Sequence, residues 1–267
     1  MILSNSEYHS RPEISKSDLD LLAKSPFHFK NKHLFRYESK AFDLGSAVHT
    51  LVLEPELFDK EYIVEKIDKR TKTGKELLEK CKAENLTILS PDDYEIAKEM
   101  ANSVLSSKLG TLFQNGKAEQ SYIGKLNDVD VRCRPDYYRE DLGLVIDLKT
   151  TIDASPDAFL KSCGSYNYYI QDAFYTDAMK SANLEVNDFI FIAVEKKPPY
   201  MVGAYRLGEP ERDLGREHYR KLLNRYKTCK NNNDWGSNEY SDINTVTGEK
   251  DYIQTLTLPS YVFYKEL

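Results

Sequence analysis

The sequence predicts an α/β fold in which a mixed β-sheet is flanked by helices. The middle of the chain carries three strand-like segments in succession, at residues 117–126, 128–135 and 143–149. Amphipathic helical patterns precede and follow them, at residues 42–54 and 166–182. Strands that alternate with helices of this kind are typical of a sheet whose faces are covered by helices.

Other segments extend the same architecture. We expect further strands at 62–67, 188–195 and 200–207, and further helices at 73–83, 91–108 and 209–232. The helix at 91–108 has a clear start, because Pro91 suits the first helical position after the cap candidate Ser90. The Pro198-Pro199 pair marks the turn between the last two strands.

The chain is long enough for one large domain. It has 267 residues, of which 40% are hydrophobic, and we find no internal repeat and no linker that divides it. We therefore expect a single domain over residues 1–267, with a core at about 10–207 and a C-terminal helix plus β-like tail at about 208–267.

Composition also bounds the compartment and the cofactors. No apolar run is long enough to span a membrane, and Met1 leads into polar residues rather than a signal peptide. The four cysteines are scattered and form no CxxC pair, so we expect neither a zinc site nor an iron–sulfur cluster. These features fit a reducing cytoplasm and argue against a membrane partner.

The segment 143–149 carries the clearest chemistry. It is rich in aliphatic residues and follows a glycine, which indicates a strand. Side chains alternate across a strand, so Asp147 and Lys149 point to one face while their apolar neighbours take the other. Asp147 and the backbone carbonyl of Leu148 are candidate ligands for Mg²⁺, and Lys149 is a candidate to orient water or offset phosphate charge. A buried Asp–Lys ion pair is the alternative reading of this segment.

Asp136 strengthens the case for a metal site. The alternating segment before it ends at Pro135, which cannot donate to a sheet ladder. A hairpin through Gly143 would bring Asp136 towards Asp147. Two carboxylates that lie close repel one another unless a cation sits between them. A plain turn aspartate is the alternative.

Three further residues are candidates on neighbouring elements. Gly45 and His49 lie four apart on one face of the helix at 42–54, so the small glycine could leave room for the imidazole to reach a metal. Glu119 lies in the expected strand 117–126, which could present it to the same site. A histidine bonded within a helix interface and a solvated edge glutamate are the alternatives.

The helix at 166–182 carries a polar stripe. Tyr168, Gln171 and Tyr175 fall at i, i+3 and i+7, so they share one face. Gln171 and Tyr175 are candidates to contact phosphate or to position water, and Tyr168 is a candidate to stack on a base. Core tyrosines with hydroxyls at the rim are the alternative.

Together these motifs resemble the PD-(D/E)XK nuclease superfamily. Asp136 followed by Asp147-Leu148-Lys149 is similar to its core motif, and Gly45 to His49 is similar to the helix that contributes a metal-binding histidine. Residues 14–19 and 25–29 resemble the N-terminal helix of RecB-type nucleases, and residues 168–175 resemble their "G-Y-x-x-Q-x-x-x-Y" helix, with Asn167 where glycine is common. The resemblance covers roughly residues 10–200 and looks most like exonuclease VIII (RecE) relatives of phage or prophage origin.

The resemblance implies a restriction-endonuclease-like fold and a set of site residues. The catalytic candidates are Lys149, Asp136, Asp147, Gln171 and Tyr175. The metal candidates are His49, Asp136, Asp147, the Leu148 carbonyl and, as a further possibility, Glu119. The DNA-binding candidates are Tyr168, Arg134, Ser15 and Ser17. The implied cofactor is Mg²⁺, which Mn²⁺ can replace.

The implied activity is exonucleolytic digestion of linear double-stranded DNA from its ends. Digestion would run 5′→3′, by in-line attack of activated water, and leave 3′ single strands for a strand-annealing partner. The resemblance also implies a homo-oligomeric ring and a location in the cytoplasm of a bacterium or of a phage-infected host. A catalytically weak recombination scaffold, a single-strand exonuclease and an endonuclease stay open as alternatives.

The net charge is unusual for a DNA-binding protein. It is −6, whereas non-specific DNA affinity depends on cations near phosphates. Basic residues do cluster at 24–40 and 66–82. We therefore expect a local basic channel rather than a basic domain, with solvated helix faces as the alternative.

Overall fold

The computed structural model describes residues 1, 3–34, 40–68, 70–240, 242–243, 250–253 and 255–258. Its helices in chain order are α1 (Asn5–Ser10), α2 (Lys16–Lys24), α3 (Pro26–Lys30), α4 (Lys40–Leu53), α5 (Phe58–Glu61), α6 (Lys72–Glu84), α7 (Pro91–Ser106), α8 (Pro156–Ser165), α9 (Tyr168–Ser181) and α10 (Glu209–Asn232). Short 3₁₀ turns lie at Lys32–Leu34, Pro55–Leu57 and Gly110–Phe113.

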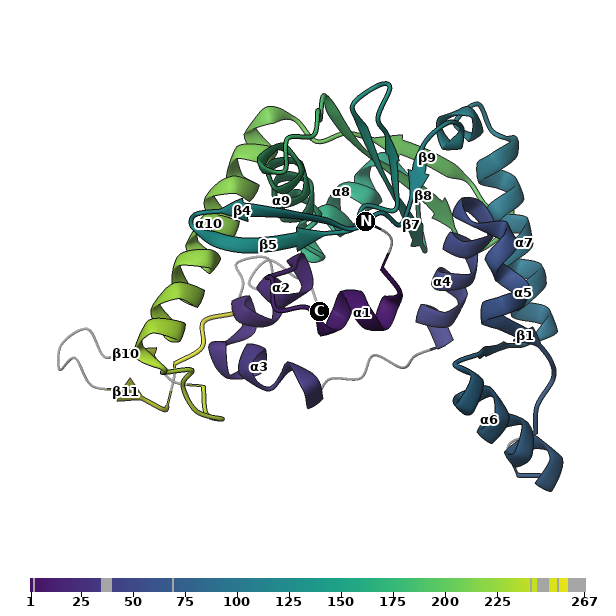
Figure 1. Cartoon of the computed structure of the whole chain (residues 1–267), viewed down its shortest axis with the longest axis horizontal. Coiled ribbons are helices and arrows are strands. Elements are labelled where there is room, and N and C mark those ends of the chain that lie inside the picture. The colour runs from purple at the N-terminus through teal and green to yellow at the C-terminus, as the bar shows by residue number, and fades with distance from the viewer. Residues whose placement is uncertain are drawn as a thin grey trace.

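The strands of the described residues form one main sheet and three small ones. They are β1 (Tyr62–Val64), β2 (Thr87–Leu89), β3 (Lys117–Ala118), β4 (Tyr122–Leu126), β5 (Val129–Cys133), β6 (Tyr137–Arg139), β7 (Leu144–Thr151), β8 (Asp188–Glu195), β9 (Val202–Tyr205), β10 (Asp242–Ile243) and β11 (Lys250–Asp251). The main sheet has the order β3-β6-β7-β8-β9. Within this main sheet, as far as the structure describes it, β7 and β8 are the parallel pair, and their register places Asp147 beside Phe191. The expected mixed α/β sheet flanked by helices is confirmed (Figure 1).

Helices α4 and α7 cover one face of the main sheet. This face carries alternate residues of the two central strands, among them Ile146, Leu148 and Ile192, which are fully buried. Val48 from α4 and Met100 from α7 complete the same apolar cluster. The predicted helix at 42–54 is therefore confirmed, with its apolar residues against the sheet.

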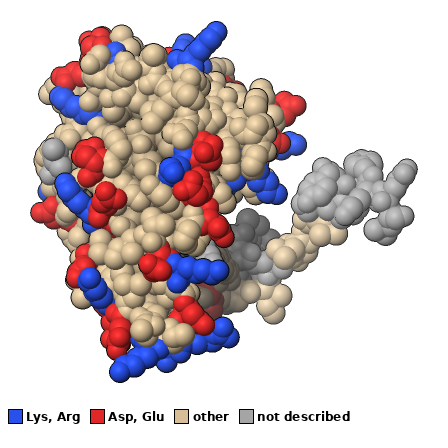
Figure 2. Space-filling model, turned by 90° about the vertical axis from the view of Figure 1, so that its right-hand side faces the viewer, with Lys and Arg blue, Asp and Glu red and all other residues tan. Residues whose placement is uncertain are grey.

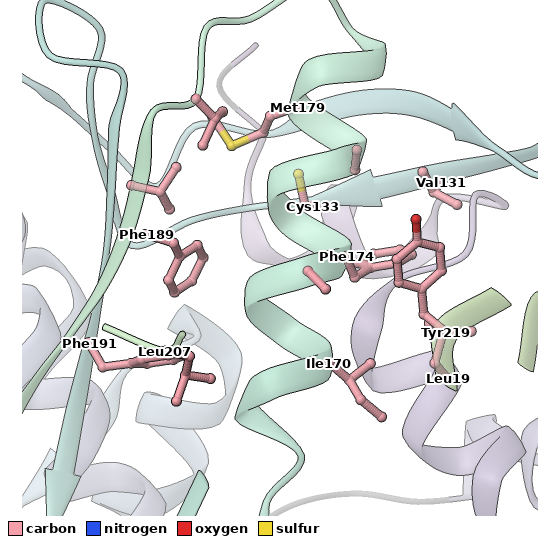
Figure 3. Packing of buried hydrophobic residues seen from close by; sticks show 14 of the residues in the cluster. Leu19, Val131, Cys133, Ile170, Phe174, Met179, Phe189, Phe191, Leu207 and Tyr219 are labelled. Carbon is pink, nitrogen blue, oxygen red and sulfur yellow. The ribbon is translucent and has the colours of Figure 1, made fainter. Parts of the chain in front are cut away.

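Helices α8, α9 and α10 lie on the other face, with α9 next to the strands. Figure 3 shows Met179 of α9 on the side of Phe189 and Phe191 of β8, and Ile170 and Phe174 on the other side of the helix, near Tyr219 and Leu19. Glycine permits close helix packing here, because a Cβ at Gly215 of α10 would lie 2.2 Å from the Tyr169 carbonyl oxygen of α9. Helix α9, which carries the polar stripe, is thus packed between the main sheet and α10.

One expected strand is broken. The predicted strand 117–126 is wrong as a single element, because the chain leaves the main sheet after β3 and re-forms as β4. The break falls at Glu119, whose φ of 47° is incompatible with an extended strand. Strand β4 pairs only with β5, in a hairpin closed by Asn127 and Asp128, both at positive φ. Positive φ at both central residues matches the twist of a tight hairpin.

Most other predicted elements are present within two or three residues of their expected limits. The strand 188–195 and the helix 209–232 coincide with β8 and α10. Helix α8 is an addition to the predicted set. Most of the expected β-like tail lies outside the described residues. Within the described part of the chain, none of the helices combines the length and apolar character needed to cross a membrane.

Candidate active site

Asp136 lies at the junction where β5 ends and β6 begins. Its Oδ2 accepts a hydrogen bond of 2.6 Å from the backbone N–H of Leu148. The pairing of β6 with β7 ends at Ile146, so the Leu148 N–H has no backbone partner on β6. The Asp136 carboxylate accepts its hydrogen bond instead. In a strand the N–H and C=O of one residue point to the same edge, so the Leu148 carbonyl faces the Asp136 side as well. The predicted hairpin does bring Asp136 to the strand that carries Asp147.

Asp147, Lys149 and Gln171 form a compact triangle. Lys149 Nζ lies 2.5 Å from Asp147 Oδ1 and donates to Gln171 Oε1 at 3.2 Å. Gln171 Nε2 donates to the other oxygen of Asp147, Oδ2. Burial raises the pKa of Asp147 to about 6, although Lys149 opposes this shift. Burial lowers the pKa of Lys149, but Asp147 and Asp136 outweigh it, and the net shift is upward. Lys149 therefore stays charged at neutral pH.

His49 reaches the same place from α4. Its Nδ1 lies 3.6 Å from Asp136 Oδ2. One turn earlier, a Cβ at Gly45 would lie 3.3 Å from Thr150 Oγ1 on β7, so the glycine allows α4 to approach the strand closely. Gly45 therefore faces β7 and His49 lies next to Asp136, as expected of two residues four apart on one helix face.

Glu119 reaches the site through the break in the strand rather than from a continuous strand. Its backbone N–H donates to the Asp136 carbonyl at 3.0 Å, which places the two residues side by side. Burial, reinforced by the neighbouring Asp136 carboxylate, raises the pKa of Glu119 to about 8. Arg134 opposes this shift, because its Nε lies 3.0 Å from Glu119 Oε2.

These residues fit a divalent cation. His49, Glu119 and Asp136 each offer a ligand atom, and the three atoms lie within 4.8 Å of one another. Asp147 is engaged by Lys149 and Gln171, yet its buried Oδ1 has no hydrogen bond of good geometry within the described part of the chain. Carboxylate oxygens with one imidazole are a donor set that Mg²⁺ or Mn²⁺ accepts. Burial is the main cause of the raised carboxyl pKa values of Asp147 and Glu119, and the neighbouring Asp136 carboxylate adds to it, so a bound cation would favour the ionised forms.

A cavity of about 260 Å³ opens onto these groups. Its lining residues are Tyr8, His9, Ser15, Lys16, Ser17, Glu119, Arg134, Asp136, Gln171 and Tyr175. Tyr175 contributes from α9, and burial raises its pKa well above the ordinary range, so the hydroxyl remains a proton donor. The start of α2 contributes Ser15 and Ser17, of which Ser17 is exposed. Ser15 is only 3% exposed, since its side chain caps α2 by bonding with Asp18.

Two candidate DNA-binding residues have partners within the protein. Arg134 lies between Glu119 and α1, donates to Asn5 Oδ1 at 2.9 Å, and covers the Tyr8 ring at 4.4 Å. Tyr168 is half-buried, with its ring stacked on Phe191 and under Lys149 Nζ. Arg134 lines the cavity with these contacts in place, whereas Tyr168 is not among the lining residues.

The first ten residues supply a wall of the cavity that the sequence motifs do not reveal. Tyr8 and His9 of α1 line it, and the ring of Tyr8 packs against both Arg132 and Arg134. Helix α1 is short and mainly exposed, so it has no apolar periodicity to indicate its role. The capping pair Ser4 and Glu7 is the one local signal that marks its start.

The backbone conformation at Asn167 explains why asparagine can stand where the family commonly has glycine. This residue precedes α9 with φ 56° and ψ 40°, which is left-handed backbone. Glycine adopts this conformation without strain, and asparagine is the side chain that tolerates it best. The replacement therefore preserves the tight turn between α8 and α9 that brings Gln171 to the site.

Charges are mixed on the face of the molecule that Figure 2 shows. Lys and Arg side chains are interspersed with Asp and Glu over the helices on the right-hand side of Figure 1. Helix α6, which carries much of the expected basic cluster at 66–82, also carries Glu76, Glu79 and Glu84. Part of the other cluster, at 35–39, lies outside the described residues.

Comparison with solved structures supports the fold. A putative exonuclease from Eubacterium rectale has a similar solved structure, with a TM-score of 0.59, 15% identity, and coverage of 85% of this chain and 88% of that one. A phage-related exonuclease from Haemophilus somnus is 14% identical over 84% of this chain and 98% of that one, with a TM-score of 0.36, too low to establish a shared fold. No curated protein sequence matches the chain significantly.

The family is established by a sequence model. The model described as "PDDEXK-like domain of unknown function (DUF3799)" matches residues 15–243. This span includes the histidine of α4, both aspartates, the lysine of β7 and the polar stripe of α9. The chain therefore belongs to this family of PDDEXK-like domains, within the PD-(D/E)XK superfamily.

Proposed function

We propose that this protein is a metal-dependent deoxyribonuclease that degrades linear double-stranded DNA from its ends. One observation carries the proposal. Three potential metal ligands from three separate segments, His49, Glu119 and Asp136, converge beside the Asp147–Lys149–Gln171 triangle. Glu119, Asp136 and Gln171 line one cavity. A buried ion pair with a structural role alone would not require the histidine and the third carboxylate.

The side chains have distinct roles in this proposal. A bound Mg²⁺ or Mn²⁺ would supply charge stabilisation for the phosphate and a water that ionises near neutral pH. His49, Glu119, Asp136 and the Leu148 carbonyl would hold the ion, together with Asp147. Lys149 is an ammonium at neutral pH, so it would donate to a phosphate oxygen or to the attacking water rather than remove a proton.

The α9 residues and the cavity mouth would position the substrate. Gln171 fixes Asp147 and Lys149 relative to one another, and the Tyr175 hydroxyl can donate to phosphate. The exposed Ser17 hydroxyl and the N-terminal end of α2 lie at the cavity, where phosphate oxygens would accept hydrogen bonds. Water would attack phosphorus in line with the leaving oxygen.

The activity test uses three DNA substrates with Mg²⁺ or with EDTA. End-labelled linear duplex should be degraded only with Mg²⁺, and closed circular duplex should survive. Lys149→Ala should lose cleavage while Lys161→Ala, which removes an exposed lysine of α8, should retain it. Cutting of the closed circle would favour an endonuclease, and preference for single strands would favour a single-strand exonuclease. If no substrate is cleaved in a metal-dependent manner, the alternative function as a DNA-binding scaffold would be favoured.

Polarity and partners rest on the resemblance to exonuclease VIII. We propose 5′→3′ digestion, a ring of identical subunits around DNA, and delivery of the 3′ strand to an annealing protein in the cytoplasm. Duplexes labelled at one 5′ or one 3′ end determine the polarity. Light scattering after size-exclusion chromatography determines the oligomeric state, and a monomer at micromolar concentration would contradict the ring.

A further inference from the structure

Three aromatic rings form a continuous stack beside the candidate catalytic lysine. Phe191 of β8 stacks on Tyr168 of α9, with centroids 5.5 Å apart and planes at 24°. Tyr168 stacks in turn on Tyr166, at 5.6 Å and 27°. Lys149 Nζ lies 4.5 Å from the centroid of the Tyr168 ring. The stack therefore runs past the lysine that would meet the scissile phosphate.

The stack leads from the core to solvent. Phe191 is fully buried, Tyr168 is half-buried, and Tyr166 is 62% exposed. Tyr168 has its ring contacts inside the protein, with Phe191, Phe159 and Tyr166. Tyr166 has one ring contact in the described part of the chain, so most of its surface remains open.

The backbone of Tyr166 is fixed at the edge of the site. Its N–H donates to the Ser162 carbonyl at 2.9 Å, which ends α8. Its carbonyl accepts a hydrogen bond of 3.0 Å from Lys16 Nζ, and Lys16 lines the catalytic cavity together with Gln171. These two bonds hold the backbone of Tyr166 beside Lys16 at the edge of the cavity, and the exposed ring keeps its stacking contact with Tyr168.

We propose that Tyr166 is a substrate-positioning residue that stacks on the nucleobase next to the phosphate being cleaved. The inference deepens the proposed nuclease function and rests on it. A nucleobase would become the fourth member of the stack, and its phosphate would then lie towards Lys149. Stacking suits a nuclease without sequence preference, because every base offers a planar face.

A purely structural role makes a different prediction. If Tyr166 only shields Tyr168 from water, an aliphatic side chain of similar size would serve as well. Tyr166→Leu retains this cover and removes the aromatic face, whereas Tyr166→Phe retains both. Leu160→Ala is a matched control, since Leu160 lies on α8 and is also 62% exposed.

Steady-state cleavage of linear duplex is the first measurement. We expect Tyr166→Ala and Tyr166→Leu to raise KM about 10-fold, with a smaller change in kcat, as loss of one base stack requires. Tyr166→Phe and Leu160→Ala should behave as wild type. A wild-type KM for Tyr166→Leu would overturn the proposal.

A duplex that lacks one base distinguishes the loss of base stacking from a loss of protein stability in the variants. A duplex that lacks the base next to the cleaved phosphate should bind wild type and Tyr166→Ala equally, because nothing remains to stack. Placing 2-aminopurine there, with Ca²⁺ in place of Mg²⁺ to prevent cleavage, should give quenched fluorescence on binding to wild type and Tyr166→Phe but not to Tyr166→Leu. Equal quenching by all three proteins would refute base stacking. If wild type cleaves no DNA, the nuclease proposal itself fails.

Discussion

Gln171 donates its side-chain amide hydrogen to Asp147 Oδ2 and thereby ties helix α9 to the central strand β7. The other end of the same amide accepts from Lys149 Nζ at 3.2 Å. A single side chain thus sets the position of both members of the Asp-Leu-Lys motif. Neither carboxylate nor hydroxyl could do this equally well, because the amide offers a donor and an acceptor in one rigid plane.

Replacing Gln171 should impair catalysis more than folding. Gln171→Leu keeps the volume but removes the hydrogen bonds to Asp147 and Lys149, so we expect kcat to fall about 10- to 100-fold, as for other partners of ligating carboxylates. Gln114→Leu is the matched control, because Gln114 follows the 3₁₀ turn at 110–113, away from the cavity lining. Cleavage rates and melting temperatures check both variants. Full activity of Gln171→Leu would remove the amide from the mechanism.

Metal affinity should increase with pH between about pH 6 and pH 8. The pKa values of Asp147 and Glu119 are raised to about 6 and about 8, so both bind protons that a cation must displace. At pH 7 binding should release protons, mainly from Glu119, and at pH 9 it should release almost none. Calorimetric titration with Mn²⁺ in buffers of different ionisation enthalpy measures this release.

The same shifts set the pH dependence of stabilisation by metal. A carboxyl whose folded pKa is raised favours the fold at low pH, and that contribution is lost as pH rises through the folded pKa. Without metal, Glu119 therefore makes the protein less stable above pH 8 than at pH 5, and Mn²⁺ should raise Tm more at the higher pH. Glu119→Gln should flatten this trend. An unchanged trend in the variant would show that Glu119 does not control it.

The sequence predicts the site best where it lies on regular elements. Asp147 and Lys149 follow from the alternation of a strand, and Gly45 and His49 from helical spacing, because both patterns are local. Glu119 shows the limit of this reasoning, since its positive φ breaks a segment whose composition resembles one strand. Glu119 contacts Arg134 and Asp136, which lie in a later segment of the chain, so its place in the site does not follow from a local pattern.

Contacts between distant segments explain the other differences. Tyr8 and His9 reach the cavity because Arg134 donates a hydrogen bond to α1. A helix of six residues is too short to show a periodic pattern that would predict this contact. The stacking of Tyr168 on a base stays a prediction. Its contacts with Phe191 and Lys149 come from strands whose packing against α9 a single sequence does not specify. The neighbouring Tyr166 is left with the exposed ring.

Asn167 should accept glycine but not a β-branched residue. Its left-handed backbone disfavours side chains with a Cβ, so Asn167→Val should destabilise the protein by about 1–2 kcal/mol. Asn167→Gly should be nearly neutral, because glycine adopts this conformation freely. Thermal unfolding followed by circular dichroism measures both. Asn224→Val, at an exposed position within α10, is the control, and an equal loss there would mean that the left-handed backbone is not the cause.

Arg212 should stabilise the fold in a pH-dependent manner. Its Nε donates to Asp172 Oδ1 at 3.0 Å, where the Asp172 side chain is 0% exposed. Burial raises the pKa of Asp172 to about 6 even though Arg212 opposes the shift. Arg212→Met removes that opposition, so the pKa should rise further and Asp172 should take up a proton near neutral pH. Because the folded pKa is raised, stability is lost as pH increases through it.

We therefore expect Arg212→Met to cost little at pH 5, where Asp172 is protonated, and about 3–5 kcal/mol at pH 8, where an unpaired buried carboxylate would remain. Urea unfolding at the two pH values, each compared with wild type, measures the difference. The double variant Arg212→Met, Asp172→Asn should lose this added pH dependence, since neither member of the ion pair can then ionise, while the neighbouring Arg216–Asp177 pair between α9 and α10 is unchanged. An equal loss at both pH values in the single variant would mean that packing, and not the charge of Asp172, determines the role of Arg212.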